Sequence, residues 1–272
     1  MAKAFSLASW NVEHFKGEKE RAARVIEFLK NQAPDIFALY EVEGKEVFNY
    51  LVDQIPSYQF HITEGPQVQE VLVGVKRNFT AFFTQKVEFK SGIKALRPGA
   101  LLTLSLEGVN YSILFLHTKS SSLPLGLGLR DDQFRRAFKF KKRLDKIAGG
   151  KGKANFMFLG DLNTMGMSYP FDRDIDPKFE LKKLDKGAKK VKMRRLTKNR
   201  AYTWWNGPGS RYKPGDFDQV VASEQLKIEQ FDGADIDVRG WPAFESESDQ
   251  AEWIKKYSDH GLLYLVVKKL DE

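Results

Sequence analysis

The feature that most constrains the fold is a short apolar run, ANFMFLG at residues 154–160, that stops at Asp161. The run has the length of a strand, and apolar residues at nearly every position indicate a strand covered on both faces. The segment FSLASWNV at residues 5–12 has the same character. A chain with such strands must place further layers on both sides of a sheet.

Amphipathic spacing predicts helices between the strands. Apolar residues recur at helical intervals from Ala22 to Leu29 and again from Phe134 to Ile147, and a further helix is expected at 45–54. Residues 99–119 form a predicted hairpin that turns at Glu107-Gly108. Other strand patterns occur at 36–42, 59–65, 70–78, 79–89, 217–223, 226–231 and 262–268. The mixture implies an α/β architecture of packed sheets with helices outside them.

The composition suits one globular core. The chain has 272 residues, 42% hydrophobic and 29% charged, and no linker divides it. We therefore expect a single domain over residues 1–272, with a basic loop region at about 172–200. No apolar run approaches the roughly 18 residues that cross a bilayer, and no signal peptide pattern opens the chain, so we expect a cytoplasmic monomer without stable membrane anchoring. The lack of cysteine excludes disulfides, thiolate metal sites and cysteine nucleophiles.

Polar residues stand where several apolar strands stop. They are Asn11, Glu41, His117, Asp161, Asn163, Asp259 and His260. Any one of them alone is better explained as a strand cap or turn residue. Together they offer hard oxygen ligands, which suit Mg²⁺ or Mn²⁺, and imidazoles that transfer protons near neutral pH.

Six ordered segments carry a family resemblance. They are Ser9-Trp10-Asn11, Tyr40-Glu41, Phe115-Leu116-His117, GDLN at 160–163, Phe217-Asp218 and Ser258-Asp259-His260. This series resembles the motifs of the endonuclease/exonuclease/phosphatase superfamily, to which deoxyribonuclease I and the exonuclease III type of abasic endonuclease belong. The resemblance implies a four-layer α/β/β/α sandwich of two mixed sheets and a divalent-metal-dependent phosphoester hydrolase.

The resemblance also implies a metal site. Glu41 corresponds to the principal ligand of Mg²⁺ or Mn²⁺. Asn11 is a candidate to complete the site or to orient Glu41 or the phosphate. Asp259, beside the presumed base, is a candidate ligand for a second metal.

The remaining motif residues correspond to catalytic groups. His260 resembles the general base that activates water, held by Asp218. Asp161 corresponds to the residue that positions the water, and Asn163 to one that contacts the phosphate. His117 resembles the histidine that stabilises the transition state or protonates the leaving oxygen.

Other positions are open to two interpretations. Arg97 is a candidate phosphate ligand or a structural ion-pair partner. Lys119 follows His117 and is a candidate for substrate binding. Trp204 is suited either to stacking on a base or sugar or to core packing. Asp216 competes with Asp218 for the histidine, and the motif favours Asp218.

Two histidines lack a matching role. His14 and His61 are interpreted as surface or structural residues.

The charge points to a polyanionic partner. The net charge is +8 and the isoelectric point is near 9.3. The basic stretch from Lys178 to Arg200, with Lys189, Lys190 and Arg194 as candidate substrate contacts, favours nucleic acid. A merely solvated loop is the alternative.

Three functions therefore remain open. The favoured one is a nuclease that hydrolyses nucleic-acid phosphodiesters with histidine-activated water. The second is a phosphatase or phosphodiesterase for a small or lipid-linked substrate, since the apolar segment SSSLPLGLGL at 120–129 suits a mobile lid or a lipid headgroup contact. The third is a non-catalytic nucleic-acid-binding protein.

Overall fold

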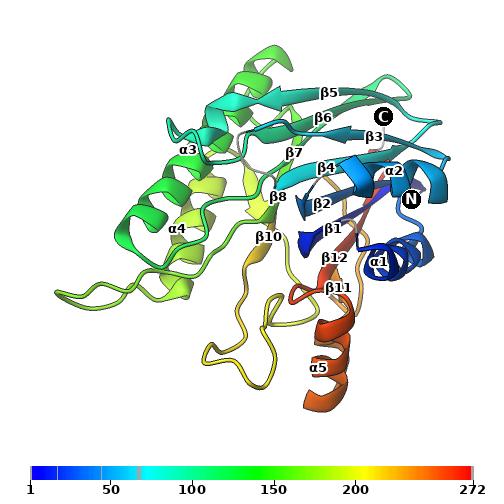
Figure 1. Ribbon diagram of the computed structural model, residues 1–272. Helices are drawn as coiled ribbons and strands as arrows, with labels where there is room; N and C mark the ends of the chain where they lie inside the picture. Colours follow the sequence, from blue (N-terminus) through cyan, green and yellow to red (C-terminus); the bar gives the residue numbers. More distant parts are fainter. Residues whose placement is uncertain (1, 17, 44, 66–68, 271–272) are drawn as a thin grey trace.

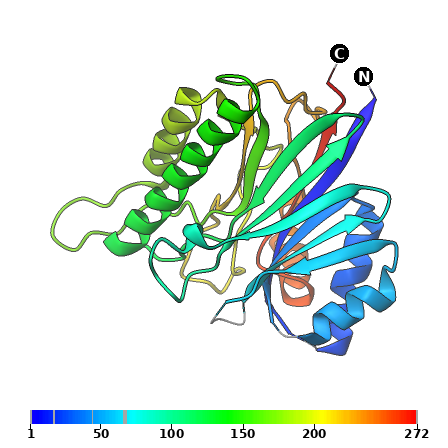
Figure 2. The same cartoon turned by 90° about the horizontal axis from the view of Figure 1, so that it is seen from above.

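The computed structural model describes residues 2–16, 18–43, 45–65 and 69–270. Within this part of the chain, no helix combines the length and the apolar character needed to cross a bilayer. The ends of the described part of the chain lie side by side at one edge of the molecule, where the backbone N–H of Lys269 donates to the Ala2 carbonyl oxygen at 2.9 Å (Figure 2).

The chain alternates between strands and helices. The strands are β1 (Lys3–Phe15), β2 (Ile36–Val42), β3 (Tyr58–Ile62), β4 (Glu70–Lys76), β5 (Thr80–Lys86), β6 (Gly99–Leu106), β7 (Val109–Phe115), β8 (Asn155–Asp161), β9 (Met193–Arg195), β10 (Asp218–Ser223), β11 (Asp237–Arg239) and β12 (Leu262–Lys268). The helices are α1 (Lys19–Gln32), α2 (Lys45–Gln54), α3 (Pro124–Ile147), α4 (Pro177–Lys190) and α5 (Glu247–Lys256), with short 3-10 helices η1 (Val87–Lys90) and η2 (Trp241–Ala243).

The strands form two mixed sheets that pack face to face. One 6-stranded sheet has the order β11-β12-β1-β2-β4-β3, and the other 6-stranded sheet has the order β5-β6-β7-β8-β10-β9. Helices α3 and α4 lie outside the second sheet, whereas α1 and α2 lie outside the first (Figures 1 and 2). The expected four-layer α/β/β/α sandwich is confirmed.

The apolar strands are buried on both faces, as their sequences predict. In β8, Met157 and Leu159 face the core between the sheets, while Phe156 and Phe158 pack toward α3 and α4. Alternate residues of β1 divide in the same way between the central core and the layer that contains α1 and α2. Strand β8 therefore ends at the buried residue Asp161, and its last residues lie beside the ends of other strands.

Gly160 allows the two sheets to approach closely beside that site. A Cβ at residue 160 would lie 2.2 Å from the Leu116 carbonyl oxygen and 2.5 Å from the Tyr40 hydroxyl, and the φ angle of Gly160 is +137°. Both facts exclude a larger residue. The tight fit brings the ends of β2 and β8 together across the interface between the sheets.

The region expected as a basic loop contains regular structure. Residues 177–190 form α4, which is capped by Asp176 and buries Leu184 and Ala188, and residues 193–195 form β9 beside β10. The expectation of a loop at 172–200 was therefore wrong for these segments. The many lysines occupy the outer face of an amphipathic helix.

Two further expectations differ from the structure. Most of the apolar segment at 120–129 forms the first turns of α3, which begins at Pro124, instead of a lid. Residues 226–231 make only isolated bridges, at Ile228 and Phe231. The short β11 and helix α5 have no counterpart in the sequence-based prediction.

Candidate active site

A cleft of about 960 Å³ opens where strands of both sheets end. It contains most of the predicted site residues: Glu41, His117, Lys119, Asp161, Asn163, Trp204, Asp259 and His260. These residues come from segments that span nearly the whole chain. The fold thus gathers into one place the polar residues that end separate apolar strands.

Backbone geometry turns two of these side chains toward the cleft. Glu41 at the end of β2 has φ +62°, and Asn163 just after β8 has φ +47°. Residues with side chains rarely adopt such values, so the surrounding structure must hold them there. Strand pairing also places Asp218 of β10 opposite Asp161 of β8.

His260 and Asp218 form a buried pair. The Nδ1 atom of His260 lies 2.8 Å from Asp218 Oδ2. Since a carboxylate accepts, Nδ1 carries the proton, and Nε2 is left to face Asp161 Oδ2 at 3.8 Å. Asp216, the competing candidate, forms an ion pair with Lys198 instead.

Asn11 links the carboxylates of the two sheets. Its Nδ2 donates to Glu41 Oε1 at 3.1 Å and to Asp161 Oδ2 at 2.9 Å, while its Oδ1 accepts the backbone N–H of Glu13 at 3.0 Å. The amide nitrogen therefore faces the carboxylates. In this arrangement Asn11 orients Glu41 and Asp161, while its oxygen already accepts one hydrogen bond.

His117 is a fully buried neighbour of the same carboxylates. Its Nε2 lies 3.4 Å from Asp161 Oδ2 and 3.8 Å from Glu41 Oε1. Burial, together with the nearby positive charge of Arg97, lowers the pKa of His117 well below its usual value. The imidazole is therefore neutral at physiological pH, with Nε2 directed toward the carboxylates.

The cleft carries more negative charge than its side chains neutralise. Burial and the charges of Asp218 and Glu41 raise the pKa of Asp161, although His260 and Asn11 oppose this shift. Burial also raises the pKa of Asp259, despite the opposing effects of His260 and Trp204. Burial disfavours the charged form of His260, but the carboxylates of Asp218, Asp161 and Asp259 outweigh it and raise the pKa of His260 well above its ordinary value.

The donor set fits a divalent cation. Ligand atoms of Glu41, His117 and Asp161 lie within 4.8 Å of one another. The buried Oδ1 of Asp259 has no hydrogen-bond partner among the described residues. An excess of buried carboxylate charge, with an oxygen that accepts no hydrogen bond and has only His260 Nε2 at 3.9 Å, is what a hard cation would balance. The residues present therefore fit the metal that the sequence predicts.

The predicted substrate contacts divide into two groups. Lys119 and Trp204 line the cleft, and Trp204 stacks on Phe217 with centroids 4.7 Å apart while its Nε1 donates to Asp259 Oδ2 at 2.7 Å. Arg97 interacts electrostatically with Glu41 and Asp161, but its guanidinium donates to Gln69.

The basic stretch is not part of the cleft. Arg194 forms a bidentate ion pair with Asp235, at 2.6 and 3.0 Å. Lys189 and Lys190 are exposed in the last turn of α4. The structure therefore does not bring these three residues to the site where sequence analysis expected them.

Sequence reasoning missed several residues that line the cleft. His14 is an exposed residue with Nδ1 3.2 Å from Glu43 Oε1, as the surface interpretation predicts, but it also lines the cleft. Strand β1 continues past Asn11 to Phe15, and Glu13 and His14 have positive φ angles that the sequence does not signal. Tyr212 and Lys213 line another part of the wall from an irregular segment that carries no motif.

Solved structures share the fold. TDP2 from Caenorhabditis elegans, in truncated form, is 19% identical, with a TM-score of 0.66 over 97% of this chain and 98% of that one. D. rerio TDP2 complexed with a single-strand DNA product is 17% identical, with a TM-score of 0.67 over 97% and 99% of the two chains. The human Nocturnin catalytic domain with bound sulfate is 16% identical, with a TM-score of 0.60 over 97% and 93%.

The sequence itself identifies the family. No curated protein sequence matches the chain. The profile of the Endonuclease/Exonuclease/phosphatase family matches residues 8–260, which include every strand-end residue described above. The protein therefore belongs to the endonuclease/exonuclease/phosphatase family of metal-dependent phosphoester hydrolases.

Proposed function

We propose that the protein is a Mg²⁺- or Mn²⁺-dependent phosphodiesterase that hydrolyses nucleic-acid backbones with water activated by His260. The observation that carries this proposal is the His260–Asp218 pair at 2.8 Å. It fixes the imidazole so that Nε2 faces the cleft beside Asp161. A cation bound among the carboxylates would offset the charges that raise the pKa of His260 and so favour its neutral form. In that form, a base held in this way can take a proton from water placed between Nε2 and a phosphorus atom.

Proton transfer leaves a positive charge on His260 that its surroundings stabilise. Asp218 accepts from Nδ1 and favours the imidazolium that forms. Asp161, held by Asn11 Nδ2 at 2.9 Å, has a carboxylate beside Nε2 that can accept from the attacking water. His260 and Asp161 together can thus orient the attacking water with respect to the base, His260.

Other side chains suit the charge that develops on the phosphate. Asn163 lines the cleft and carries an amide donor, and neutral His117 can donate from Nε2. Donors held in a buried site stabilise a developing negative charge more strongly than they do in water. A divalent cation held by Glu41, with Asp259 as the candidate ligand of a second cation, would neutralise charge on the phosphate oxygens and on the leaving oxygen.

Three observations support nucleic acid as the substrate. The net charge is +8. The cleft wall has a stacked Trp204–Phe217 pair with Tyr212 beside it, which suits base or sugar stacking. The fold is also that of D. rerio TDP2, which was crystallised with a single-strand DNA product.

A lipid-linked phosphoester is the second candidate, supported by exposed apolar side chains near the cleft. Leu123, Leu125, Phe171 and Phe179 are 61, 66, 86 and 59% exposed. They adjoin or lie close in sequence to the cleft residues Ser122, Ser168 and Pro177. An exposed apolar rim of this kind is a feature of surfaces that contact membranes or other proteins.

Hydrolysis of a substrate panel tests the proposal. The panel comprises single- and double-stranded DNA, RNA, sphingomyelin, a phosphoinositide and a bis-aryl phosphodiester, each with Mg²⁺, Mn²⁺ or EDTA. We expect metal-dependent cleavage of nucleic acid that falls by about 10²- to 10⁴-fold in His260→Ala. Cleavage of lipid substrates alone would favour the second candidate, and nucleic-acid binding without any turnover would contradict the proposed hydrolysis.

A further inference from the structure

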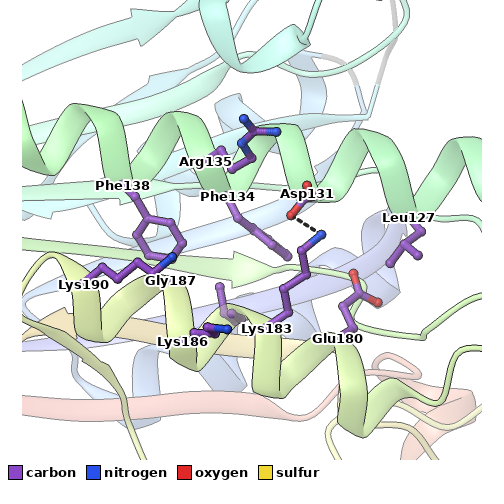
Figure 3. A pocket seen from close by; sticks show the side chains of 11 residues that line it. Leu127, Asp131, Phe134, Arg135, Phe138, Glu180, Lys183, Lys186, Gly187 and Lys190 are labelled. Carbon is purple, nitrogen blue, oxygen red and sulfur yellow. Dashed lines mark ion pairs between the residues drawn. The ribbon is translucent and has the colours of Figure 1, made fainter.

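A second hollow, of about 450 Å³, lies between α3 and α4. Figure 3 shows Lys183 of α4 reaching Asp131 of α3, with which it forms an ion pair at 2.9 Å. Farther along the helices, the ring of Phe138 lies over Gly187, where a Cβ would come within 2.4 Å of it. Gly187 thus lets the ring form the floor of a groove between the helices.

The two helices run in parallel, with their N-terminal ends toward the cleft. Asp131 pairs with Lys183, and Phe138 packs on Gly187, so residue numbers increase together along both helices. The groove continues beyond Phe138 into a hollow that is lined by Lys139, Lys142 and Lys190. The groove therefore runs from the neighbourhood of the active site along the helical layer, α3 and α4, that covers the second sheet.

The groove carries unbalanced positive charge. Arg135, Lys139 and Lys142 of α3 and Lys186 and Lys190 of α4 line it and are exposed. Across the part of the chain that the structure describes, none of these five has a carboxylate within ion-pair distance.

The acidic groups along the groove are already paired. Asp131 binds Lys183, and Asp132 binds Arg136 at 2.6 Å. Glu180 binds the buried Arg130 at 2.7 Å. The unpaired lysine and arginine side chains therefore make the electrostatic potential along the groove positive.

We propose that this groove binds the sugar-phosphate backbone of a nucleic-acid strand that extends out of the active-site cleft. Pro177, the first residue of α4, lines the cleft, and Glu180, one turn later, lines the groove. One strand can thus pass from the catalytic residues onto the helices. The inference rests on the proposed function, because it takes nucleic acid as the substrate.

The shape of the groove favours a strand over a membrane. Its apolar floor is formed by Phe134 and Leu184, which are 4% and 2% exposed, and by the partly buried Phe138. Among the described residues that line the groove, no large apolar side chain is exposed, and the exposed Leu125 and Phe179 lie only at its cleft end. A flat bilayer would therefore reach the basic rims without burying apolar side chains along the groove. A narrow polyanion can lie between the basic side chains of α3 and those of α4 and contact both rows.

The spacing of the basic side chains along α3 matches the spacing of phosphates in a nucleic-acid backbone. Arg135, Lys139 and Lys142 follow each other at helical i, i+4, i+7 positions and so share one face over about 10 Å. Phosphates of one strand in a duplex are about 3.4 Å apart along its axis, and they lie farther apart in an extended strand. Each row of basic side chains can therefore face two or three phosphates.

The test compares two variants with the same change in net charge. One is Lys139→Gln/Lys186→Gln/Lys190→Gln in the groove, and the control is Lys19→Gln/Arg24→Gln/Lys30→Gln on α1, in the opposite outer layer. Binding of labelled single-stranded DNA of about 6 and about 24 nucleotides is measured by fluorescence anisotropy in EDTA, at roughly 50 to 200 mM salt. Hydrolysis of a bis-aryl phosphodiester with metal reports on the active site.

We expect the groove variant to bind the long strand about 10-fold more weakly at low salt, and the slope of log K against log salt to become shallower by about 2, since three phosphate contacts are lost. Binding of the short strand, hydrolysis of the bis-aryl substrate and all properties of the control variant should stay near wild type. Equal behaviour of the two variants with the long strand would overturn the inference.

Other outcomes separate this inference from the proposed function. Groove-dependent binding of DNA by a wild-type protein that cleaves no nucleic acid would remove the proposed activity and keep the groove. Loss of binding to phosphatidylserine vesicles in the groove variant, with DNA binding unchanged, would overturn the inference in favour of a membrane contact.

Discussion

Two buried aspartates show how differently this fold treats a carboxylate. Asp35 and Asp161 are 5% and 2% exposed. Asp35 accepts from the backbone N–H and the hydroxyl of Ser6, both at 2.9 Å, and from Lys3 and Lys76, both at 2.8 Å. Burial alone would raise its pKa, but these partners lower the pKa of Asp35 to about 2.

Asp161 is compensated only in part, by the Asn11 amide, the backbone N–H of Asn163 and the nearby His260. Its neighbours include the carboxylates of Asp218 and Glu41, and its pKa is raised. A buried carboxylate surrounded by cations and donors stabilises the fold. A buried carboxylate kept beside like charges lowers the stability of the fold. The difference supports the proposal that Asp161 belongs to a site that takes a further cation or a reacting group.

Asp218→Asn should have the largest effect. The amide would no longer hold Nδ1 of His260 as a donor with the same tautomer or stabilise its imidazolium. We expect kcat to fall by about 10³- to 10⁴-fold, measured with the best nucleic-acid substrate. Asp216→Asn is the matched control, since Asp216 pairs with Lys198 and should affect stability more than kcat. The reverse ranking would assign the orienting role to Asp216.

Asp161→Asn should separate activity from stability. We expect kcat/KM to fall by about 10²- to 10³-fold, because the carboxylate beside His260 Nε2 and His117 is lost. The free energy of unfolding in EDTA should stay the same or increase, because a buried like charge is removed. Urea denaturation measures it, and a clear loss of stability would show that Asp161 is compensated as Asp35 is.

The two aspartates also differ in how far the sequence predicts them. The strand-end position of Asp161, in GDLN after an apolar run, and the ordered motifs around it pointed to the cleft. Asp35 follows Pro34 and resembles an ordinary turn residue, because its partners Ser6 and Lys76 lie 29 and 41 residues away. Long-range pairing of this kind leaves no local pattern.

The same reason explains the errors on the basic stretch. The sequence shows Asp176 before Pro177 and apolar residues at helical spacing, but the many lysines obscured the helix. Arg194 was expected to contact substrate, yet its partner Asp235 lies 41 residues away. Which lysines face a groove depends on how α4 packs on α3, and spacing within α4 cannot reveal that.

Asp35→Asn should affect stability alone. The amide keeps the shape of the carboxylate but loses its charge-assisted bonds to Lys3 and Lys76. We expect the free energy of unfolding at neutral pH to fall by about 2 to 3 kcal/mol, measured by urea denaturation. The kcat/KM value should remain near wild type. A large loss of activity without loss of stability would contradict the structural role.

The smallest expected effect is the pH dependence of that difference. The pKa of Asp35 is about 2 in the folded protein and 3.8 ordinarily, so its ionisation stabilises the fold above pH 3.8 and this contribution is lost as pH falls through 2. The shift corresponds to about 2 kcal/mol. The gap in stability between wild type and Asp35→Asn should therefore be constant above about pH 5 and shrink by that amount toward about pH 2, because protonated Asp35 resembles the amide. Asp235, whose pKa is also lowered to about 2, remains in both proteins, so it cancels in the comparison. A gap that stayed constant across this range would mean that packing, and not charge, accounts for the contribution of Asp35.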